Sequence, residues 1–141
     1  MKQQRNTKQR LLVLDTVLAH TDHPSADQLY IEARRADSHI SRGTVYRNLS
    51  CLAERGDISH VRVPGADRYE QRTQLHYHLL CTDCGAVCDA PVQYRRELDR
   101  SVAEASGYVI FRHRTVFEGL CPQCQARRER AAAPDEPSDE L

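Results

Sequence analysis

The sequence contains no long hydrophobic run and no net charge, and each absence narrows the possible functions. None of its 141 residues falls in an apolar stretch approaching the ~20 residues of a membrane-spanning helix. The basic N-terminus also lacks the apolar core of a secretory signal, so we expect a cytoplasmic protein with no membrane partner. In that compartment, six cysteines are more typical of metal ligands or reactive thiols than of disulfides.

The zero net charge conceals a difference between the two halves of the chain. Residues 1–72 carry 12 Lys and Arg against 9 Asp and Glu, whereas residues 73–141 carry 8 against 11. The N-terminal ten residues include Lys2, Arg5, Lys8 and Arg10 and no acid. We therefore expect any contact with DNA to be made by the front half.

The front half has the pattern of three helices followed by a hairpin. Apolar spacing, N-cap residues and turn residues predict helices over residues 7–20, 26–36 and 42–56, and strands over residues 58–63 and 68–71. Such a series forms a winged helix-turn-helix, whose third helix enters the major groove of DNA. We predict a winged-helix DNA-binding domain over residues 1–72.

Apolar stripes predict which faces of the first and third helices are buried. On the first helix the stripe consists of Leu11, Leu14, Val17 and Leu18; on the third it consists of Val45, Leu49 and Leu52. The opposite face of the third helix presents Arg42, Tyr46, Arg47 and Ser50. That polar face is the candidate DNA-reading surface.

The back half has a different pattern. Strands are predicted over residues 77–81, 86–90, 108–111 and 115–119, and an amphipathic helix over residues 92–105. Residues 71–75 are the predicted hinge, and the acidic tail over residues 131–141 is predicted to be disordered. The predicted fold class is thus α+β, with a C-terminal α/β dimerisation and metal-binding domain over residues 73–130.

Four of the cysteines form two CxxC pairs, Cys81/Cys84 and Cys121/Cys124, separated by 36 residues. Each pair can direct two thiolates at one point, and two pairs complete the tetrahedral site that Zn(II) prefers. A redox CxxC or incidental buried cysteines are the alternatives, but the presence of two pairs favours a structural zinc. Cys51 is expected in the core, and Cys88 receives no role.

His76 and His78 flank Tyr77, so on a strand both imidazoles lie on one face. Two converging imidazoles suit Zn(II), Fe(II) or Mn(II), although they can also be solvated surface side chains. The candidate partners are His23, Glu70 and Asp89. Because these residues come from both halves, a metal bound by all of them would orient the halves and couple metal occupancy to DNA affinity.

With these motifs the sequence resembles the ferric uptake regulator family of bacterial metalloregulators. The resemblance rests on Arg5-x-Thr7-x-Gln9-Arg10, His23-Pro24-Ser25-Ala26-Asp27, Gly43-Thr44-Val45-Tyr46-Arg47-Asn48-Leu49, His76-x-His78-Leu79-Leu80-Cys81-x-x-Cys84-Gly85 and Cys121-x-x-Cys124. It spans residues 5 to 126 and implies a homodimeric repressor acting at AT-rich operators. It also implies that Tyr46 and Arg47 lie in the major groove, that Arg5 reaches the minor groove, and that His23, Glu70, His76, His78 and Asp89 hold a regulatory Fe(II) or Mn(II). The candidate DNA-binding residues are thus Arg5, Arg42, Thr44, Tyr46 and Arg47.

Two departures from the family pattern bear on what is sensed. Leu75 and Tyr77 stand where many iron regulators of the family have ligands for a further metal site, so we expect that site to be absent, although His113 is present near it. The His76-Tyr77-His78 pattern is similar to the peroxide-sensing branch, but that branch usually has Asp where this chain has Glu70. Peroxide sensing therefore stays open beside metal sensing, and a zinc uptake regulator is the alternative within the family.

Two functions of other classes fit the sequence less well. A zinc-ribbon scaffold that binds no DNA would leave the basic N-terminus and the face of Arg42, Tyr46 and Arg47 without a purpose. A metalloenzyme would need an open coordination position and a positioned acid or base. Nothing beyond the ligands indicates a substrate site, so we expect no enzymatic activity.

Overall fold

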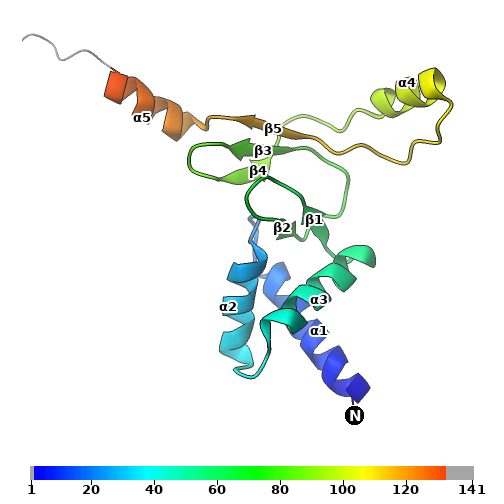
Figure 1. Ribbon diagram of the computed structural model, residues 1–141, viewed down its shortest axis with the longest axis vertical. Helices are drawn as coiled ribbons and strands as arrows, with labels where there is room; N and C mark the ends of the chain where they lie inside the picture. The colour runs from blue at the N-terminus through cyan, green and yellow to red at the C-terminus, as the bar shows by residue number, and fades with distance from the viewer. Residues whose placement is uncertain (1, 133–141) are drawn as a thin grey trace, which may run out of the picture. The chain divides into compact units, whose positions relative to one another are not determined.

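The computed structural model describes residues 2–132, and its contacts divide the chain into two compact units, Met1–His76 and Tyr77–Leu141 (Figure 1). The predicted domain boundary after residue 72 stays a prediction. No helix among residues 2–132 combines the length and apolar character needed to cross a membrane.

The first unit is a winged helix. Its elements are α1 (Lys2–Leu18), α2 (Ala26–Ala36), α3 (Arg42–Glu54), β1 (Ser59–Val61) and β2 (Arg68–Glu70). The two strands pair antiparallel, with Ser59 opposite Glu70. The three helices contact one another, and the hairpin follows α3 (Figure 1). The predicted three helices and hairpin are confirmed.

Local capping explains why α2 begins where it does. The Ser25 hydroxyl accepts a hydrogen bond from the Gln28 amide at 3.2 Å, and the Gln28 side chain accepts one from the Ser25 amide at 2.9 Å. This reciprocal pair satisfies two amides that the first turn leaves without helical partners. The Ser41 hydroxyl caps α3 in a similar way, by accepting from the Thr44 amide at 3.1 Å.

The core of this unit confirms one predicted stripe and corrects the other. On α3 the side chains of Val45, Leu49 and Leu52 are buried. On α1 the buried residues are Val13 and Val17, whereas Leu11 and Leu18 are 54% and 45% exposed. The prediction is confirmed for Val17, and Leu14 packs against the core, but it was wrong for Leu11 and Leu18. The reason is that α1 carries two overlapping apolar stripes, and the one containing Val13, four residues before Val17, faces the core.

The start of α1 is a second correction. The helix begins at Lys2 instead of Thr7, so the exposed Arg5 lies within it and not in a segment before it. Lys, Gln and Arg are good helix formers, which allows the helix to extend toward the N-terminus. The helix ends at Leu18, two residues before the predicted end.

The second unit is built on a three-stranded sheet. Its elements are β3 (His78–Cys81), β4 (Val87–Asp89), α4 (Arg96–Ser106), β5 (Val116–Gly119) and α5 (Pro122–Ala132). The strand order is β4-β3-β5, with β3 antiparallel to β4 and parallel to β5. The combination of helices and antiparallel and parallel strands confirms the predicted α+β class.

Helix α4 lies between two extended chain segments, away from the sheet of its own unit (Figure 1). It begins at Arg96, four residues later than predicted, and Gly107 closes it with a φ of 75°. No residue of α4 is buried. Its predicted apolar face is therefore present but uncovered, with Leu98 and Val102 each 51% exposed.

Two further expectations for this unit are corrected. Residues 108–111, predicted to be a strand, pair with no strand of the described chain, and Tyr108, Val109 and Phe111 are 72%, 80% and 86% exposed. Helix α5 was not predicted, and it includes residues 131 and 132 of the tail that was expected to be disordered. The rest of that tail, residues 133–141, lies outside the described residues.

Candidate metal centres and DNA-reading surface

The four cysteines of the CxxC pairs meet at one end of the sheet. Cys81 is the last residue of β3 and stands opposite Gly119 of the parallel strand β5, two residues before Cys121. The four Sγ atoms lie within 4.8 Å of one another, and those of Cys84 and Cys121 are 3.9 Å apart. Tetrahedral coordination with Zn–S bonds of about 2.3 Å requires sulfurs about 3.8 Å apart. The cluster therefore has the dimensions and the donor set of a structural zinc site.

Backbone amides already favour thiolate at part of this cluster. The Cys121 amide donates to Cys81 Sγ at 3.4 Å, and the Cys124 amide donates to Cys121 Sγ at 3.4 Å. Hydrogen bonds from the Cys121 amide and from the first CxxC turn lower the pKa of the Cys81 thiol to about 6. Hydrogen bonding to Cys121 and burial raise the pKa of the Cys124 thiol to about 12. Four thiolates so close together need a cation to offset their repulsion.

In the first unit, a buried carboxylate lies between two imidazoles. Glu70 Oε2 is 2.6 Å from His23 Nε2, and Glu70 Oε1 is 2.6 Å from His76 Nε2. Glu70 is 4% exposed and His23 is 8% exposed. Burial of a carboxylate is costly unless a positive charge or several donors compensate it.

The wing brings His23 to Glu70. The Tyr69 amide donates to the Pro24 carbonyl at 2.9 Å, and the Arg68 guanidinium donates to the His23 carbonyl at 3.1 Å. The linker between α1 and α2 therefore runs along β2, and the side chain of His23 reaches the last residue of that strand. Proline supports this arrangement because it has no amide proton to leave unpaired in the linker.

The orientation of His76 prepares it as a metal ligand. Its Nδ1 donates to the Gln74 carbonyl at 2.5 Å, since a carbonyl oxygen can only accept. In the neutral ring this leaves the lone pair of Nε2 directed at Glu70 Oε1. A lone pair facing a carboxylate oxygen is unfavourable unless a cation or a proton lies between them. The arrangement thus fits a divalent metal held by imidazole nitrogens and carboxylate oxygens.

In the second unit, His78 and Asp89 stand opposite each other on β3 and β4. His78 Nε2 and Asp89 Oδ1 are 3.6 Å apart, and the His78 side chain is 12% exposed. This pair offers a second combination of imidazole and carboxylate, two residues along the chain from His76.

Tyr77 takes part in a polar cluster that the sequence did not predict. Its hydroxyl lies 2.6 Å from His113 Nε2, and His113 Nδ1 lies 2.7 Å from Asp99 Oδ1. The Tyr94 hydroxyl donates to Asp99 Oδ2 at 2.6 Å, and the hydrogen bonds from Tyr94 and His113 lower the pKa of Asp99. Tyr77 and Asp99 thus bind the two ring nitrogens of His113, the histidine near the position of the family's further metal site. The expected absence of that site stays a prediction.

The outer face of α3 carries the candidate DNA-reading side chains, and hydrogen bonds hold them. The Arg47 guanidinium donates to Thr44 Oγ1 at 3.2 Å, and Thr44 Oγ1 lies 2.8 Å from Ser41 Oγ. Arg42 and the Tyr46 hydroxyl both donate to Asp27 Oδ1 at the start of α2. Tyr46 remains 37% exposed.

Comparison with known proteins places this combination of fold and sites. The model of the Ferric uptake regulator family matches residues 1–118. The chain belongs to this family. The peroxide-responsive repressor PerR of Staphylococcus aureus is 28% identical over 122 residues, covering 86% of this chain and 82% of that protein.

Solved structures of the ferric uptake regulator family share the architecture. The peroxide stress regulator of Campylobacter jejuni is 28% identical with a TM-score of 0.70, covering 87% of this chain and 93% of that one. The ferric uptake regulator of Helicobacter pylori, described as having three functional metal binding sites, is 24% identical with a TM-score of 0.71. The alignment covers 84% of this chain and 80% of that one, and at this identity the likeness shows a shared fold. The resemblance inferred from the motifs is confirmed at the level of the family.

Proposed function

We propose that this chain is a metal-dependent transcriptional repressor that binds operator DNA as a homodimer when Fe(II) or Mn(II) occupies its regulatory site. The observation that carries the proposal is the buried carboxylate of Glu70, 2.6 Å from the Nε2 atoms of both His23 and His76. A divalent metal would satisfy these three groups together. The site lies at the end of the wing, so its occupancy acts on the DNA-binding unit.

The proposed full ligand set is the one that the sequence motifs imply: His23, Glu70, His76, His78 and Asp89. Support comes from the spacing of His76 and His78, which alternate along an extended segment and can present their imidazoles to the same side. Imidazole nitrogens together with carboxylate oxygens suit Fe(II), Mn(II) or Zn(II). When bound, the metal neutralises the carboxylates and fixes its ligands in one geometry.

Such a site couples metal to DNA by ordinary linkage. A metal that binds better when the two units are held in one orientation stabilises that orientation, and DNA that prefers the same orientation binds more tightly. Cys81, Cys84, Cys121 and Cys124 hold a separate Zn(II) that is structural, since four thiolates leave no open position.

DNA contacts are assigned to the outer face of α3 and to the N-terminal end of α1. Arg42, Thr44, Tyr46 and Arg47 face the major groove, as expected for the third helix of a winged helix. Arg5 is exposed near the start of α1, where it can enter an adjacent minor groove. Narrow minor grooves of AT-rich DNA attract arginine, so we propose an AT-rich operator.

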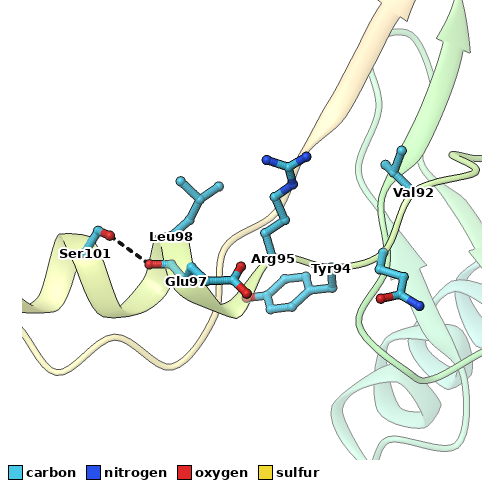
Figure 2. A pocket seen from close by; sticks show the side chains of 7 residues that line it. Val92, Tyr94, Arg95, Glu97, Leu98 and Ser101 are labelled. Atoms are coloured by element: carbon cyan, nitrogen blue, oxygen red, sulfur yellow. Dashed lines mark hydrogen bonds between the residues drawn. The ribbon is translucent and has the colours of Figure 1, made fainter.

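The second unit supplies the surface for a homodimer. Among residues 2–132, Tyr108, Val109 and Phe111 are the most exposed large apolar side chains, and Leu98 and Val102 on α4 are half exposed. Beside the first turn of α4, Val92, Tyr94, Arg95 and Leu98 line a hollow, and the Ser101 hydroxyl donates to the Glu97 carbonyl at 2.9 Å (Figure 2). Exposed apolar surface of this kind is typical of an interface. A second copy of the same surface is the occupant we propose.

Two narrower functions are distinguished by what the metal does. Peroxide sensing is favoured by the relatives named for peroxide response, whereas Glu70 stands where that branch usually has Asp. A zinc uptake regulator would respond to Zn(II) at the site of His23, Glu70 and His76. A zinc scaffold without DNA affinity would respond to none of these metals, and we propose no catalytic activity.

The test is DNA binding by the zinc-loaded protein and its His78→Ala variant, with Mn(II), Fe(II) or Zn(II) added separately. Duplexes selected by the wild type from a randomised library serve as operator. We expect Fe(II) and Mn(II) to tighten wild-type binding, and His78→Ala to abolish the stimulation while zinc content and melting stay unchanged. His39→Ala, which removes an exposed histidine of the first unit, is the matched control.

The outcomes separate the candidate functions. Stimulation by Zn(II) alone would make the protein a zinc regulator. Release of the iron-loaded protein by a small anaerobic dose of peroxide, with oxygen added to His23 or His76, would make it a peroxide sensor. Binding that no metal changes would overturn the regulatory site, and absence of any selected DNA would overturn the repressor.

A further inference from the structure

Asp27, on the first turn of α2, binds two of the four side chains assigned to the major groove. Its Oδ1 atom accepts hydrogen bonds from the Tyr46 hydroxyl and from the Arg42 guanidinium, 19 and 15 residues away in the chain. The Arg42 guanidinium also lies over the ring of Tyr30, 4.7 Å from its centroid. Asp27 and Arg42 are 65% and 57% exposed, so this cluster is on the surface that DNA would approach.

On the other side of the same helix, Arg47 pairs with no carboxylate of residues 2–132. Arg47 donates to the hydroxyl of Thr44, which pairs with Ser41. Arg47 therefore keeps its full charge available for DNA, whereas the charge of Arg42 is balanced by Asp27. The two arginines of one face are thus prepared for different roles.

The bond to Asp27 limits what the Tyr46 hydroxyl can do at a base. A tyrosine hydroxyl has one proton, and here it is donated to the carboxylate, which also raises the pKa of Tyr46. What remains for DNA is a lone pair on the oxygen and the apolar edge of the ring. In the major groove, adenine N6 and cytosine N4 are donors and thymine presents a methyl group, whereas guanine N7 and O6 are acceptors.

We propose that Asp27 is a specificity-determining positioning residue of the DNA-reading surface, which holds the Tyr46 hydroxyl as an acceptor and keeps Arg42 from binding phosphate. This inference rests on the proposed function as a DNA-binding repressor. Tyr46 then favours bases that donate a hydrogen bond or present a methyl group and disfavours guanine. The carboxylate also opposes the phosphate backbone, which lowers affinity for DNA of any sequence.

The charge and the acceptor atom of Asp27 can be separated by substitution. Asp27→Asn keeps an oxygen that accepts from Tyr46 but removes the charge. Asp27→Ala removes both. Asp57→Ala is the matched control, because Asp57 is an exposed partner of Arg55 (3.4 Å) beyond the other end of α3, about 20 Å away along the helix.

The experiment is selection from a library of randomised duplexes with the full-length, zinc-loaded protein and added Mn(II), followed by salt titration on one random duplex. We expect Asp27→Ala to accept guanine at a position where the wild type excludes it, and Asp27→Asn to keep the wild-type preference. Both variants should bind random DNA with a salt slope steeper by about one, which is about a three-fold greater loss of affinity between about 50 and about 200 mM salt. In a Tyr46→Phe background, Asp27→Ala should no longer change the base preference.

Each other outcome counts against the inference. If Asp27→Ala and the wild type select identical sequences, with unchanged melting, Asp27 has no part in the base preference. The same change of base preference and salt slope in Asp57→Ala would mean that the effect comes from net charge alone. If the wild type selects no sequence, the proposed function fails and this inference fails with it. If the wild type selects a sequence and both Asp27 variants select the same one, the protein remains a DNA-binding repressor and Asp27 loses its proposed role.

Discussion

The two units of the chain differ in how they are stabilised. The first has a continuous apolar core that joins all three helices to the wing. In the second, the buried apolar residues are Tyr77, Leu80 and Ala90, together with the cysteines Cys81 and Cys124 of the metal cluster. Its helix α4 buries no residue. We therefore expect the first unit to fold on its own side chains and the second to need a metal and a covering surface.

This difference follows from the sequence of each unit. In the first, helices with one apolar stripe each enclose a common interior, and burial of that surface drives folding. In the second, several large apolar residues lie exposed on α4 and on the extended residues 108–111. These segments contact few other described residues. Small domains with little apolar core are commonly completed by metal sites or by oligomerisation. We therefore expect the two units to respond to different perturbations.

The largest effect is expected from removal of the zinc. Cys124→Ser, or a strong chelator, should unfold the second unit and abolish dimerisation, because structural zinc sites contribute on the order of 10 kcal/mol to folding. The first unit should keep its helical circular dichroism. Zinc content, sedimentation and proteolysis of each unit are the measurements. Cys88→Ser, which alters an exposed cysteine outside the cluster, is the control, and a Cys124→Ser dimer with full zinc content would contradict the assignment.

The second effect concerns the uncovered surface of the second unit. Phe111→Asp should weaken the dimer by about 4 kcal/mol, roughly a thousand-fold in dissociation constant, because it would place a charge in a desolvated contact. Analytical ultracentrifugation across a range of concentrations measures this change. Ile31→Asp places the same charge on an apolar residue of the first unit that is 55% exposed, and it should leave the dimer intact. Equal behaviour of the two variants would place the interface elsewhere.

The third effect concerns the core of the first unit. Leu49→Ala removes a fully buried side chain of α3 and should lower the free energy of unfolding by about 3 kcal/mol, through lost burial and a residual cavity. Denaturant unfolding followed by circular dichroism measures the loss. Zinc content should be unchanged, since no ligand of the cysteine cluster lies in this unit. Loss of zinc together with this core would show that the units fold as one.

Local signals explain which features could be predicted from the sequence. Helix α2 was predicted with its observed bounds because Ser25 is a favourable N-cap residue, and in the structure Ser25 and Gln28 form a capping box. The cysteine cluster followed from spacing alone, since a CxxC turn fixes where its thiolates point. The pairing of α3 side chains with the core followed from a stripe of three aliphatic residues at helical spacing.

Features that depend on distant partners could not be predicted in this way. Asp27 meets Tyr46 across 19 residues, and Asp99 meets His113 across 14, and no local pattern marks either carboxylate. Residues 108–111 alternate like a strand, but a strand needs a neighbour, and the described chain offers none. The apolar pattern of this segment is consistent with burial against another chain.

The smallest effect is a dependence of the first unit's stability on pH. His20 Nδ1 lies 2.8 Å from Asp22 Oδ1, and His20 Nε2 lies 2.6 Å from Glu32 Oε2 on α2. Burial lowers the pKa of His20, but the hydrogen bonds and charges of Glu32 and Asp22 outweigh it and raise the pKa above its ordinary value of 6.5. Because the folded state holds the proton more tightly, this contribution to stability is complete below pH 6.5 and is lost as the pH rises through the raised pKa.

The comparison of wild type with His20→Gln isolates this contribution. The difference in the free energy of unfolding should be largest near pH 6 and should shrink toward pH 9, because glutamine does not titrate. Glu32→Gln should reduce the same difference, since it removes one of the two carboxylates that favour the imidazolium. A difference that stays constant across this range would mean that His20 is neutral in the folded unit, held by hydrogen bonds alone. In that case the interaction of His20 with Glu32 of α2 would contribute no charge-dependent stability.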